Sequence, residues 1–328
     1  MRLILRHDLR AAPFGAPHSA LYKAAIDQSI WADKVGFHTI MTHEHHCEDG
    51  YIPSPLVLAA AIAGATRQAR IEIRIALLPL YDPIRMAEDW AVLDLISEGR
   101  ADVVVAVGYR RYEFALFGVD YDTRGQRMDE AIAIIKQAWT GEPFEYRGQT
   151  VQITPRPYRQ PRPPIYFGGN SKAAARRAAR EGDGFFPPPN STLIDFYQQE
   201  CRRLGKTPGP DGRMDHNGNI AFVAEDPAAA WDEVGRYLLY QHNAYAVFAV
   251  EAMSRSTEAQ ATFPFKPATT RQELADLRTY LIVSPDEAVR MAKESGVMVL
   301  QPLAGGIPPD LARKSLDLVE RKVLPALG

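Results

Sequence analysis

The sequence predicts an α/β fold, a TIM (β/α)8 barrel with insertion segments over its C-terminal face. Short β-type runs alternate with longer helical patterns along the 328 residues, and eight strands each followed by a helix give the strand count of this barrel. The run Asp102–Val107 is almost continuously apolar, which is typical of a parallel strand buried on both faces. No GxGxxG follows the first strand and no linker divides the chain. We therefore expect a single domain over residues 1–328 rather than a doubly wound fold with two domains.

Eight short runs rich in apolar residues are the expected strands. The third of them alternates in its first half and is apolar on both faces in its second half. The expected strands are Arg2–Arg6, His38–Met41, Ile71–Leu78, Asp102–Val107, Pro164–Gly168, Gly184–Phe186, Asn219–Val223 and Val297–Leu300.

Apolar residues at helical spacing predict the helices between these strands. Asp82 is expected to cap one helix, with Pro83 at its first position and Gly99 at its end. The other expected helices are Ala20–Val35, Pro55–Thr66, Arg124–Thr140, an Ala/Arg-rich helix that follows Ser171 and ends near Gly182, Leu193–Leu204, Pro227 to about Leu239, Pro285–Ser295 and Asp310 to about Leu324.

Two stretches break the alternation of strands and helices. Glu142–Pro164 is rich in proline and is expected to leave the barrel, as a β-hairpin. Gln241–Leu277 mixes aromatic residues, Met and Thr without clean periodicity. A structureless stretch of this length is uncommon and often covers a site, so we expect a lid insertion over 241–277 that contains short helices.

The composition excludes several classes of protein. Lys and Arg number 38 against 40 Asp and Glu, so no basic excess indicates nucleic acid. Two cysteines imply no disulfide framework. No apolar run approaches the ~20 residues of a membrane helix, and no signal-peptide pattern precedes the first strand. We expect a soluble cytoplasmic protein that binds neither nucleic acid nor membrane.

In a TIM barrel the site lies at the carboxyl ends of the strands. This rule selects Thr42–Cys47, Leu78–Asp82, Val107–Arg111, Gly168–Ser171 and Ala304–Gly306.

The segment Thr42–Cys47 reads Thr-His-Glu-His-His-Cys and is the densest group of reactive side chains in the chain. On a strand, His43 and His45 would share a face and could begin a metal site. Further ligands are lacking, because no histidine falls on the fifth, sixth or eighth strand and no Asp ends the eighth. Two other interpretations remain: the imidazoles are structural, or one of them acts as proton donor or acceptor beside a cofactor.

The small residues Gly168 to Ser171 open a helix, where free N–H groups attract anions. This turn is either a phosphate site or a tight turn with a serine cap. Gly305-Gly306 is the rival phosphate site. The pair Arg110-Arg111 could hold phosphate or lie in a solvated loop. The apolar segment Ile75–Leu78 could lie against one face of a flat aromatic cofactor or belong to the ordinary hydrophobic core.

The order of several segments resembles the bacterial luciferase-like flavin-dependent monooxygenase family, from residue 1 to about 190 and more loosely beyond. The segments are Glu44–His46, Leu78–Pro83, Asp94–Arg100, Tyr109, Glu113-Phe114, Phe117-Gly118, Arg124, Trp139 and Pro164–Tyr166.

This resemblance implies an enzyme that uses O2 and reduced FMN, supplied by a separate flavin reductase, to oxidise a small organic substrate through a peroxyflavin. It also implies a homodimer. His45, and Glu44 beside it, match the catalytic positions. The positions expected to bind the cofactor are Leu78, Gly108, Tyr109, Arg110, Arg124, Gly169, Asn170 and Ser171. A coenzyme F420-dependent oxidoreductase that transfers hydride, a non-catalytic flavin-binding homologue and, more remotely, a metal hydrolase are the alternatives.

The sequence departs from the family at Val107, where many members have an arginine. If no other residue replaces it, the loss of one charge-assisted contact costs about 1.5–3 kcal/mol, and Arg110 and Arg111 are the candidates to replace it. Candidates for substrate contact are Phe14, Tyr51 and Phe263.

Overall fold

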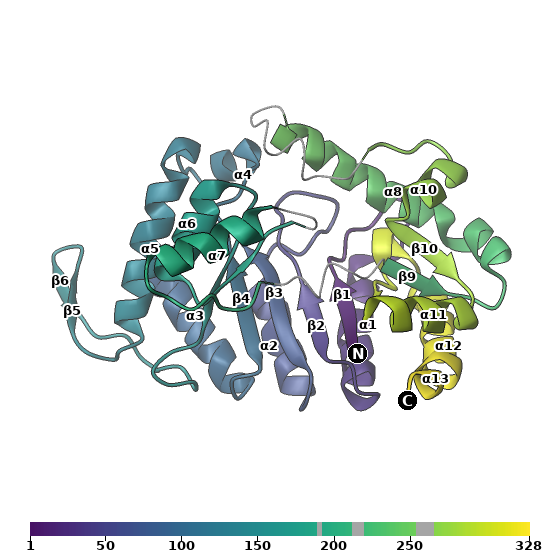
Figure 1. Cartoon of the computed structure of the whole chain (residues 1–328), viewed down its shortest axis with the longest axis horizontal. Coiled ribbons are helices and arrows are strands. Elements are labelled where there is room, and N and C mark those ends of the chain that lie inside the picture. Colours follow the sequence, from purple (N-terminus) through teal and green to yellow (C-terminus); the bar gives the residue numbers. More distant parts are fainter. Residues whose placement is uncertain (189–191, 212–219, 254–265) are drawn as a thin grey trace. The chain divides into compact units, whose positions relative to one another are not determined.

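The computed structural model describes residues 1–188, 192–211, 220–253 and 266–328, with the side chains of 249–253 left out (Figure 1). The chain divides into two compact units. The first contains Met1–Pro53 and Arg213–Gly328, and the second contains Ser54–Gly212.

The sheet of the first unit is parallel, with the strand order β10-β9-β11-β1-β2. At its centre β1 pairs with both β2 and β11, with Ile4 opposite Thr39 on one side and Val299 on the other. The carboxyl ends of these three strands therefore meet at one edge. The strands are β1 (Arg2–His7), β2 (Thr39–Thr42), β9 (Ile220–Val223), β10 (Tyr280–Val283) and β11 (Val297–Leu300).

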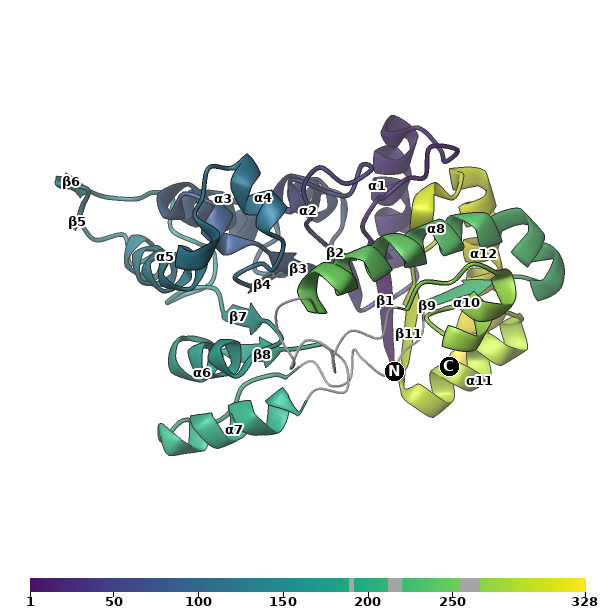
Figure 2. The same cartoon turned by 90° about the horizontal axis from the view of Figure 1, so that it is seen from above.

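The longest helix of the first unit, α8 (Pro227–Met253), lies against the short 3₁₀ turn Ala304–Gly306 that follows β11 and against β10 (Figure 2). The other α-helices described in this unit are α1 (His18–Lys34), α10 (Arg271–Leu277), α11 (Pro285–Ser295), α12 (Pro309–Leu318) and α13 (Leu324–Leu327).

The second unit has a parallel sheet in the order β3-β4-β7-β8 and a separate antiparallel hairpin, β5-β6. The strands are β3 (Arg70–Ala76), β4 (Ala101–Val105), β5 (Phe144–Tyr146), β6 (Gln149–Val151), β7 (Ile165–Gly168) and β8 (Gly184–Phe186). The helices are α2 (Pro55–Ala65), α3 (Pro83–Ile96), α4 (Arg111–Leu116), α5 (Arg124–Ala138), α6 (Lys172–Glu181) and α7 (Leu193–Arg203).

The predicted alternation of parallel strands and helices is confirmed, as is the hairpin between Glu142 and Pro164. All five residues of β4 are buried, as expected for a strand covered on both faces. Asp82 caps α3 by accepting hydrogen bonds from the backbone N–H groups of Ile84 and Arg85, at 2.9 and 3.3 Å. Local sequence signals therefore placed these elements correctly.

Two predicted strands end two residues early, and one strand was not predicted. The third strand ends at Ala76 rather than Leu78, because its pairing with β4 shifts register after Arg74 and a 3₁₀ turn begins at Leu78. The fourth ends at Val105 rather than Val107. Strand β10 was not predicted, because its four apolar residues directly follow a stretch without periodicity.

The helix expected to end near Leu239 continues to Met253, so residues 241–253 do not form a separate short helix. No Gly or Pro lies between Gly235 and the end of the helix at Met253, and Leu238, Ala246 and Phe248 are buried. A short helix, α10, does occupy 271–277. The middle of the expected lid, 254–265, lies outside the described residues, and the lid stays a prediction.

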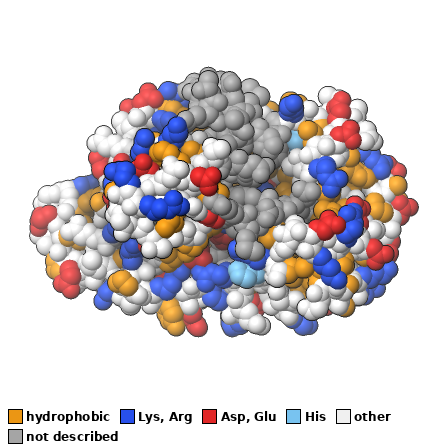
Figure 3. Space-filling model, viewed as in Figure 1, with side chains coloured by type: hydrophobic (Ala, Val, Ile, Leu, Met, Phe, Trp, Pro, Cys, Tyr) orange, Lys and Arg blue, Asp and Glu red, His pale blue; other side chains and the backbone are white. Residues whose placement is uncertain are grey.

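Positive and negative side chains are interspersed over the face drawn in Figure 3. Among the described residues, no helix has both the length and the apolar character to cross a membrane.

Candidate functional site

A buried carboxylate lies at the carboxyl end of β1. Asp8 is 1% exposed, and its Oδ2 accepts hydrogen bonds from Gln241 Nε2 at 2.5 Å, Gln301 Nε2 at 2.8 Å and Tyr245 OH at 3.0 Å. Gln301 follows β11, and the other two donors lie one turn apart on α8. Three neutral donors therefore satisfy this buried carboxylate oxygen.

Tyr245 extends this network to two further residues. Its hydroxyl lies 2.8 Å from Arg6 Nη2, which donates to it, and 2.8 Å from the hydroxyl of Tyr51. Since a phenol has one proton and Tyr245 gives it to Asp8, Tyr51 donates to Tyr245. Burial raises the pKa of both phenols above the ordinary value, so both stay protonated donors.

The predicted catalytic histidine lies beside these aromatic residues. The ring of His45 is 4.9 Å from that of Tyr51 and 4.6 Å from that of Phe248 on α8, between ring centroids. Its backbone N–H donates to Ile52 O, and Ile52 N–H donates to Asp8 O, at 3.2 and 3.0 Å. The loop after β2 is thereby fixed to the end of β1, with His45 buried at 8% exposure.

Glu44 contacts a different histidine. Its Oε1 lies 3.0 Å from His46 Nε2, and both residues are buried. β2 ends at Thr42, so the assumption that His43 and His45 share one face of a strand is wrong. Among the described residues, no group of three or more His, Cys, Asp or Glu is placed to hold a metal ion.

Arg10 completes this part of the first unit. Its guanidinium carbon lies 4.8 Å from the ring centroid of Phe248, 5.3 Å from that of Tyr51 and 5.8 Å from that of Tyr245. Its Nη1 is 3.4 Å from Glu48 Oε2. The arginine is 1% exposed, so the aromatic rings provide most of its surroundings.

The second unit contains the residues expected to bind the cofactor. Gly169 has φ +138°, and a Cβ at this position would lie 2.7 Å from the Cβ of Ala174. Ser171 caps α6 by accepting from the N–H of Ala174 at 3.2 Å. The turn is thus closely packed onto the helix, and the remaining N–H groups of the first turn have no acceptor within the helix itself.

Tyr121 contacts both the loop after β4 and the start of α5. The Tyr121 hydroxyl donates to the carbonyl of Tyr109 at 3.2 Å. The guanidinium carbon of Arg124 lies 3.8 Å from the centroid of the Tyr121 ring. Arg124 also donates to the carbonyl of Tyr121 at 2.8 Å. Arg124 begins α5, and the next residue, Gly125, accepts from Arg177 of α6 at 3.3 Å. The start of α5 therefore adjoins α6.

Other predicted positions have partners within the protein. Arg110 is buried, and its Nη1 lies 3.8 Å from the buried carboxylate of Glu113. Gly108 has φ +75° and directly adjoins the ring of Phe114. Leu78 is fully buried in its 3₁₀ turn.

The rival phosphate site is already filled by protein. The N–H of Gly305 donates to Gln241 Oε1 at 3.1 Å, and that of Gly306 donates to the carbonyl of Leu303 at 3.1 Å. A Cβ on Gly305 would come within 2.1 Å of the carbonyl oxygen of Tyr237 on α8. These contacts favour the Gly169–Ser171 turn over Gly305-Gly306 as an anion site.

Asp8, Arg10 and Gln301 were not among the site residues predicted from sequence, although all three follow the ends of strands and the strand-end rule would have selected them. Tyr245 and Phe248 were not predicted either, because the helix that carries them was expected to end earlier. Of the substrate candidates, Tyr51 lies in the network, Phe14 packs on Tyr237 and Tyr240 at 46% exposure, and Phe263 lies outside the described residues.

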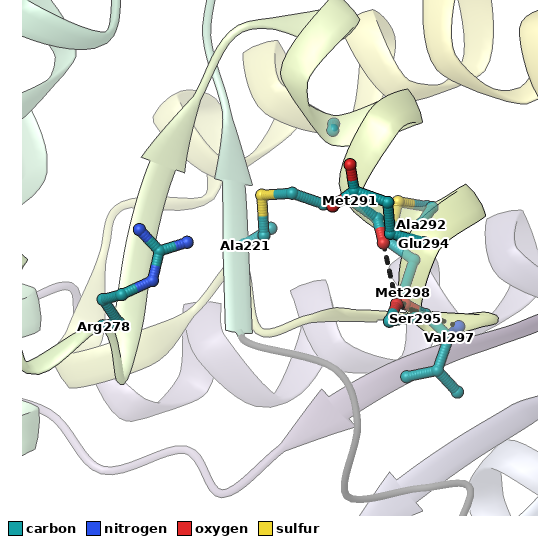
Figure 4. A pocket seen from close by; sticks show the side chains of 9 residues that line it. Ala221, Arg278, Met291, Ala292, Glu294, Ser295, Val297 and Met298 are labelled. Atoms are coloured by element: carbon teal, nitrogen blue, oxygen red, sulfur yellow. Dashed lines mark hydrogen bonds between the residues drawn. The ribbon is translucent and has the colours of Figure 1, made fainter.

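One cavity of about 280 Å³ lies elsewhere in the first unit. Met291 and Ser295 of α11 line it together with Val297 and Met298, which begin β11 (Figure 4). It therefore lies towards the amino end of this strand, away from the edge that holds His45.

A family model described as luciferase-like monooxygenase matches residues 9–294. An uncharacterized protein, y4vJ, from Sinorhizobium fredii is 32% identical over 174 residues, 51% of this chain and 50% of the relative. The oxygenase component of the flavin-dependent trigonelline monooxygenase from Acinetobacter baylyi is 28% identical over 235 residues, 67% of this chain and 65% of the relative. The chain thus spans about half to two thirds of the length of these relatives.

Solved structures share the fold over the whole chain. Monooxygenase RslO1 from Streptomyces bottropensis is 22% identical with a TM-score of 0.74, covering 100% of both chains. The oxygenating constituent of 3,6-diketocamphane monooxygenase from Pseudomonas putida, in complex with FMN, is 20% identical with a TM-score of 0.71, covering 99% of this chain and 98% of that one.

The coenzyme F420-dependent tetrahydromethanopterin reductase from Methanopyrus kandleri is 15% identical with a TM-score of 0.62, covering 100% of this chain and 99% of that one. Together with the family match, these likenesses confirm the predicted TIM-barrel class.

Proposed function

The chain belongs to the luciferase-like monooxygenase family, and from this premise we propose that it is a flavin-dependent monooxygenase that uses reduced FMN and O2 to oxidise a small organic substrate. One observation carries the proposal. His45 is buried against Tyr51 and Phe248 beside the carboxyl ends of β1 and β2, the edge at which barrel enzymes bind substrate and cofactor.

The residues of the second unit fit a flavin phosphate. The turn Gly169–Ser171 offers the amino terminus of the ten-residue helix α6 to an anion. At the start of α5, which adjoins α6 through the contact of Arg177 with Gly125, the Nε of Arg124 is buried and has no hydrogen-bond partner among the described residues. We propose that these groups hold the phosphate, and that Gly108, Tyr109 and Leu78 contact the rest of the cofactor.

Arg110 has a different part in this proposal. Its charge already faces the buried Glu113, so it orders the loop after β4 rather than replacing the family arginine missing at Val107. Arg124 is then the main positive charge offered to the phosphate.

When bound, reduced FMN supplies the electrons that activate dioxygen. The chain supplies the surroundings of the reaction. Tyr51 and Phe248 keep water from His45, and the imidazole holds or releases a proton at one ring nitrogen. Glu44 acts through His46, to which it is bonded, and so positions the loop that carries His45.

Two partners follow from this function. The Acinetobacter relative is named an oxygenase component, which supports a separate flavin reductase as the source of reduced FMN. A homodimer is supported by exposed apolar side chains on the adjacent helices α2 and α3: Val57, Val92, Leu95 and Ile96. Sedimentation should give a dimer for the wild type and a monomer for a Val57→Lys, Leu95→Lys variant.

A coenzyme F420-dependent oxidoreductase is the second candidate. Val107, in place of an arginine near the proposed phosphate site, favours it. The fold likeness to the Methanopyrus kandleri reductase also allows it.

Anaerobic titration with reduced FMN tests the proposal. Micromolar or tighter binding, well above the affinity for oxidised FMN, is expected of a monooxygenase supplied by a reductase. Arg124→Gln should weaken this binding about 10-fold or more, the effect of one charge-assisted contact, whereas Arg147→Gln, at an exposed arginine, should not. Absence of binding, with tight binding of F420, would establish the second candidate instead.

A further inference from the structure

Arg10 carries an unused pair of hydrogen-bond donors. Its Nε and Nη2 are both buried and have no hydrogen-bond partner within the described part of the chain. Both nearby carboxylates approach the other terminal nitrogen, since Glu48 Oε2 and Asp49 Oδ2 lie 3.4 and 3.7 Å from Nη1. The acidic residues thus fix the guanidinium by one end and leave the opposite edge free.

The free edge has the geometry of a carboxylate site. Within a planar guanidinium, the N–H bonds of Nε and Nη2 point in the same direction, which is the fork that binds the two oxygens of a carboxylate. A buried donor without a partner is costly, so a ligand that supplies two acceptors here is strongly favoured. Lysine cannot reproduce this paired contact.

The surroundings specify the rest of the ligand. The ring centroids of Phe248, Tyr51 and Tyr245 lie 4.8 to 5.8 Å from the guanidinium carbon of Arg10. The Nε of Arg6, beside the same Tyr245, is also buried without a hydrogen-bond partner in the described residues. The two arginines face the carboxylates of Asp8, Glu48 and Asp49, so the selection for a carboxylate ligand rests on the buried N–H donors of Arg10 rather than on net charge.

We propose that Arg10 recognises the substrate, and that the substrate is a carboxylate with an aromatic or other apolar body. The carboxylate binds the Nε–Nη2 edge, and the apolar body lies among the aromatic rings next to His45. This inference rests on the proposed function, because it names the substrate class of the same site.

The test uses benzoate and its uncharged counterpart benzamide as probes, with the purified protein free of flavin and calorimetry as the readout. Wild type should bind benzoate at least 10-fold more tightly than benzamide. Arg10→Gln should remove this preference, and Arg10→Lys should lose most of it despite keeping the charge. Arg313→Gln, at an exposed arginine of the same unit, should bind both probes as wild type does.

Equal affinity of wild type for the two probes, or no binding of benzoate, would overturn the proposal and leave an ordered water as the partner of the fork. An unchanged preference in Arg10→Lys would overturn it as well, and this variant keeps the test valid if Arg10→Gln does not fold. The reduced-FMN titration is independent. Loss of flavin binding with the benzoate preference intact would refute the proposed function and not the role of Arg10.

Discussion

The hydroxyl groups of Tyr51 and Tyr245 lie 2.8 Å apart, although 194 positions separate the two residues in the sequence. Tyr51 follows the loop that carries His45, and Tyr245 lies on α8. The contact connects that loop to the helix and, through Asp8, to the end of β1. A single hydroxyl therefore stabilises three separate segments around the proposed site.

Replacing Tyr245 with Phe should lower the free energy of unfolding by about 1–3 kcal/mol, because Arg6, Tyr51 and Asp8 each lose a partner in a buried setting. Urea denaturation measures the change. The matched control is Tyr158→Phe, at a residue that is 54% exposed, where a change within about 0.5 kcal/mol is expected. Equal losses in the two variants would show that the network contributes no stability.

His45→Ala should leave the affinity for reduced FMN within about threefold of wild type, because the proposed phosphate contacts come from other residues. Product formed per flavin oxidised should fall by about 100-fold or more, the usual contribution of a positioned proton donor or acceptor. Stopped-flow spectroscopy and product analysis provide the two readouts, with His18→Ala as the exposed control. Unchanged turnover would remove His45 from the mechanism.

The helix caps and the hairpin, which were predicted correctly, depend on residues that are close together in the sequence. The caps at Asp82 and Ser171 each satisfy N–H groups two or three residues ahead. The hairpin was visible because prolines interrupt the helical pattern around it. Interactions over such short distances depend little on the rest of the fold, and the sequence is enough to identify them.

The network around Asp8 could not be predicted in the same way. Its donors Gln241 and Gln301 lie 233 and 293 positions away. Only the pairing of β1 with β11 and the full length of α8 bring these side chains together. The strand-end rule could select Asp8 and Gln301 as candidates, but not their contact.

Gly305→Ala should be destabilising beyond the cost of its backbone conformation. Gly305 has φ +62°, and a Cβ there would come within 2.1 Å of the carbonyl oxygen of Tyr237. Gly118 also has φ +62°, with nothing within 4 Å of the added atom. Gly118→Ala should therefore cost about 1–2 kcal/mol, and Gly305→Ala clearly more, by thermal or urea unfolding. Equal costs would mean that α8 moves away freely from the turn after β11.

His7 should make stability depend on pH. It is 1% exposed, and burial lowers its pKa to about 3, whereas the unfolded chain has the ordinary value of about 6.5. The unfolded state therefore takes up the proton first as the pH falls. The stabilisation is complete above about pH 6.5 and is lost progressively towards pH 3, by up to about 1.4 kcal/mol per pH unit.

The His7→Gln variant should flatten this dependence between pH 6 and pH 4, as measured by urea denaturation at several pH values. His18→Gln, at an exposed histidine, should keep the wild-type slope. If both variants keep the wild-type dependence of the unfolding free energy on pH, His7 is not the group whose protonation causes that dependence.

Arg159 connects the segment Asp94–Arg100, part of the family resemblance, to the rest of the second unit. Its Nε donates to Asp94 Oδ1 at 2.7 Å and its Nη1 to Asp102 Oδ1 at 2.9 Å. Asp94 is fully buried, so the segment has a structural reason to retain its carboxylate.

Arg159→Gln should lower the free energy of unfolding by about 3–5 kcal/mol, because it leaves the charge of Asp94 buried without its partner. The control is Arg147→Gln, which breaks a 3.0 Å ion pair with Asp82 at the surface and should cost no more than about 1 kcal/mol. Adding Asp94→Asn to Arg159→Gln should restore part of the loss, since the uncompensated charge is then removed. A double variant no more stable than Arg159→Gln would show that the lost hydrogen bonds, rather than the buried charge, cause the destabilisation.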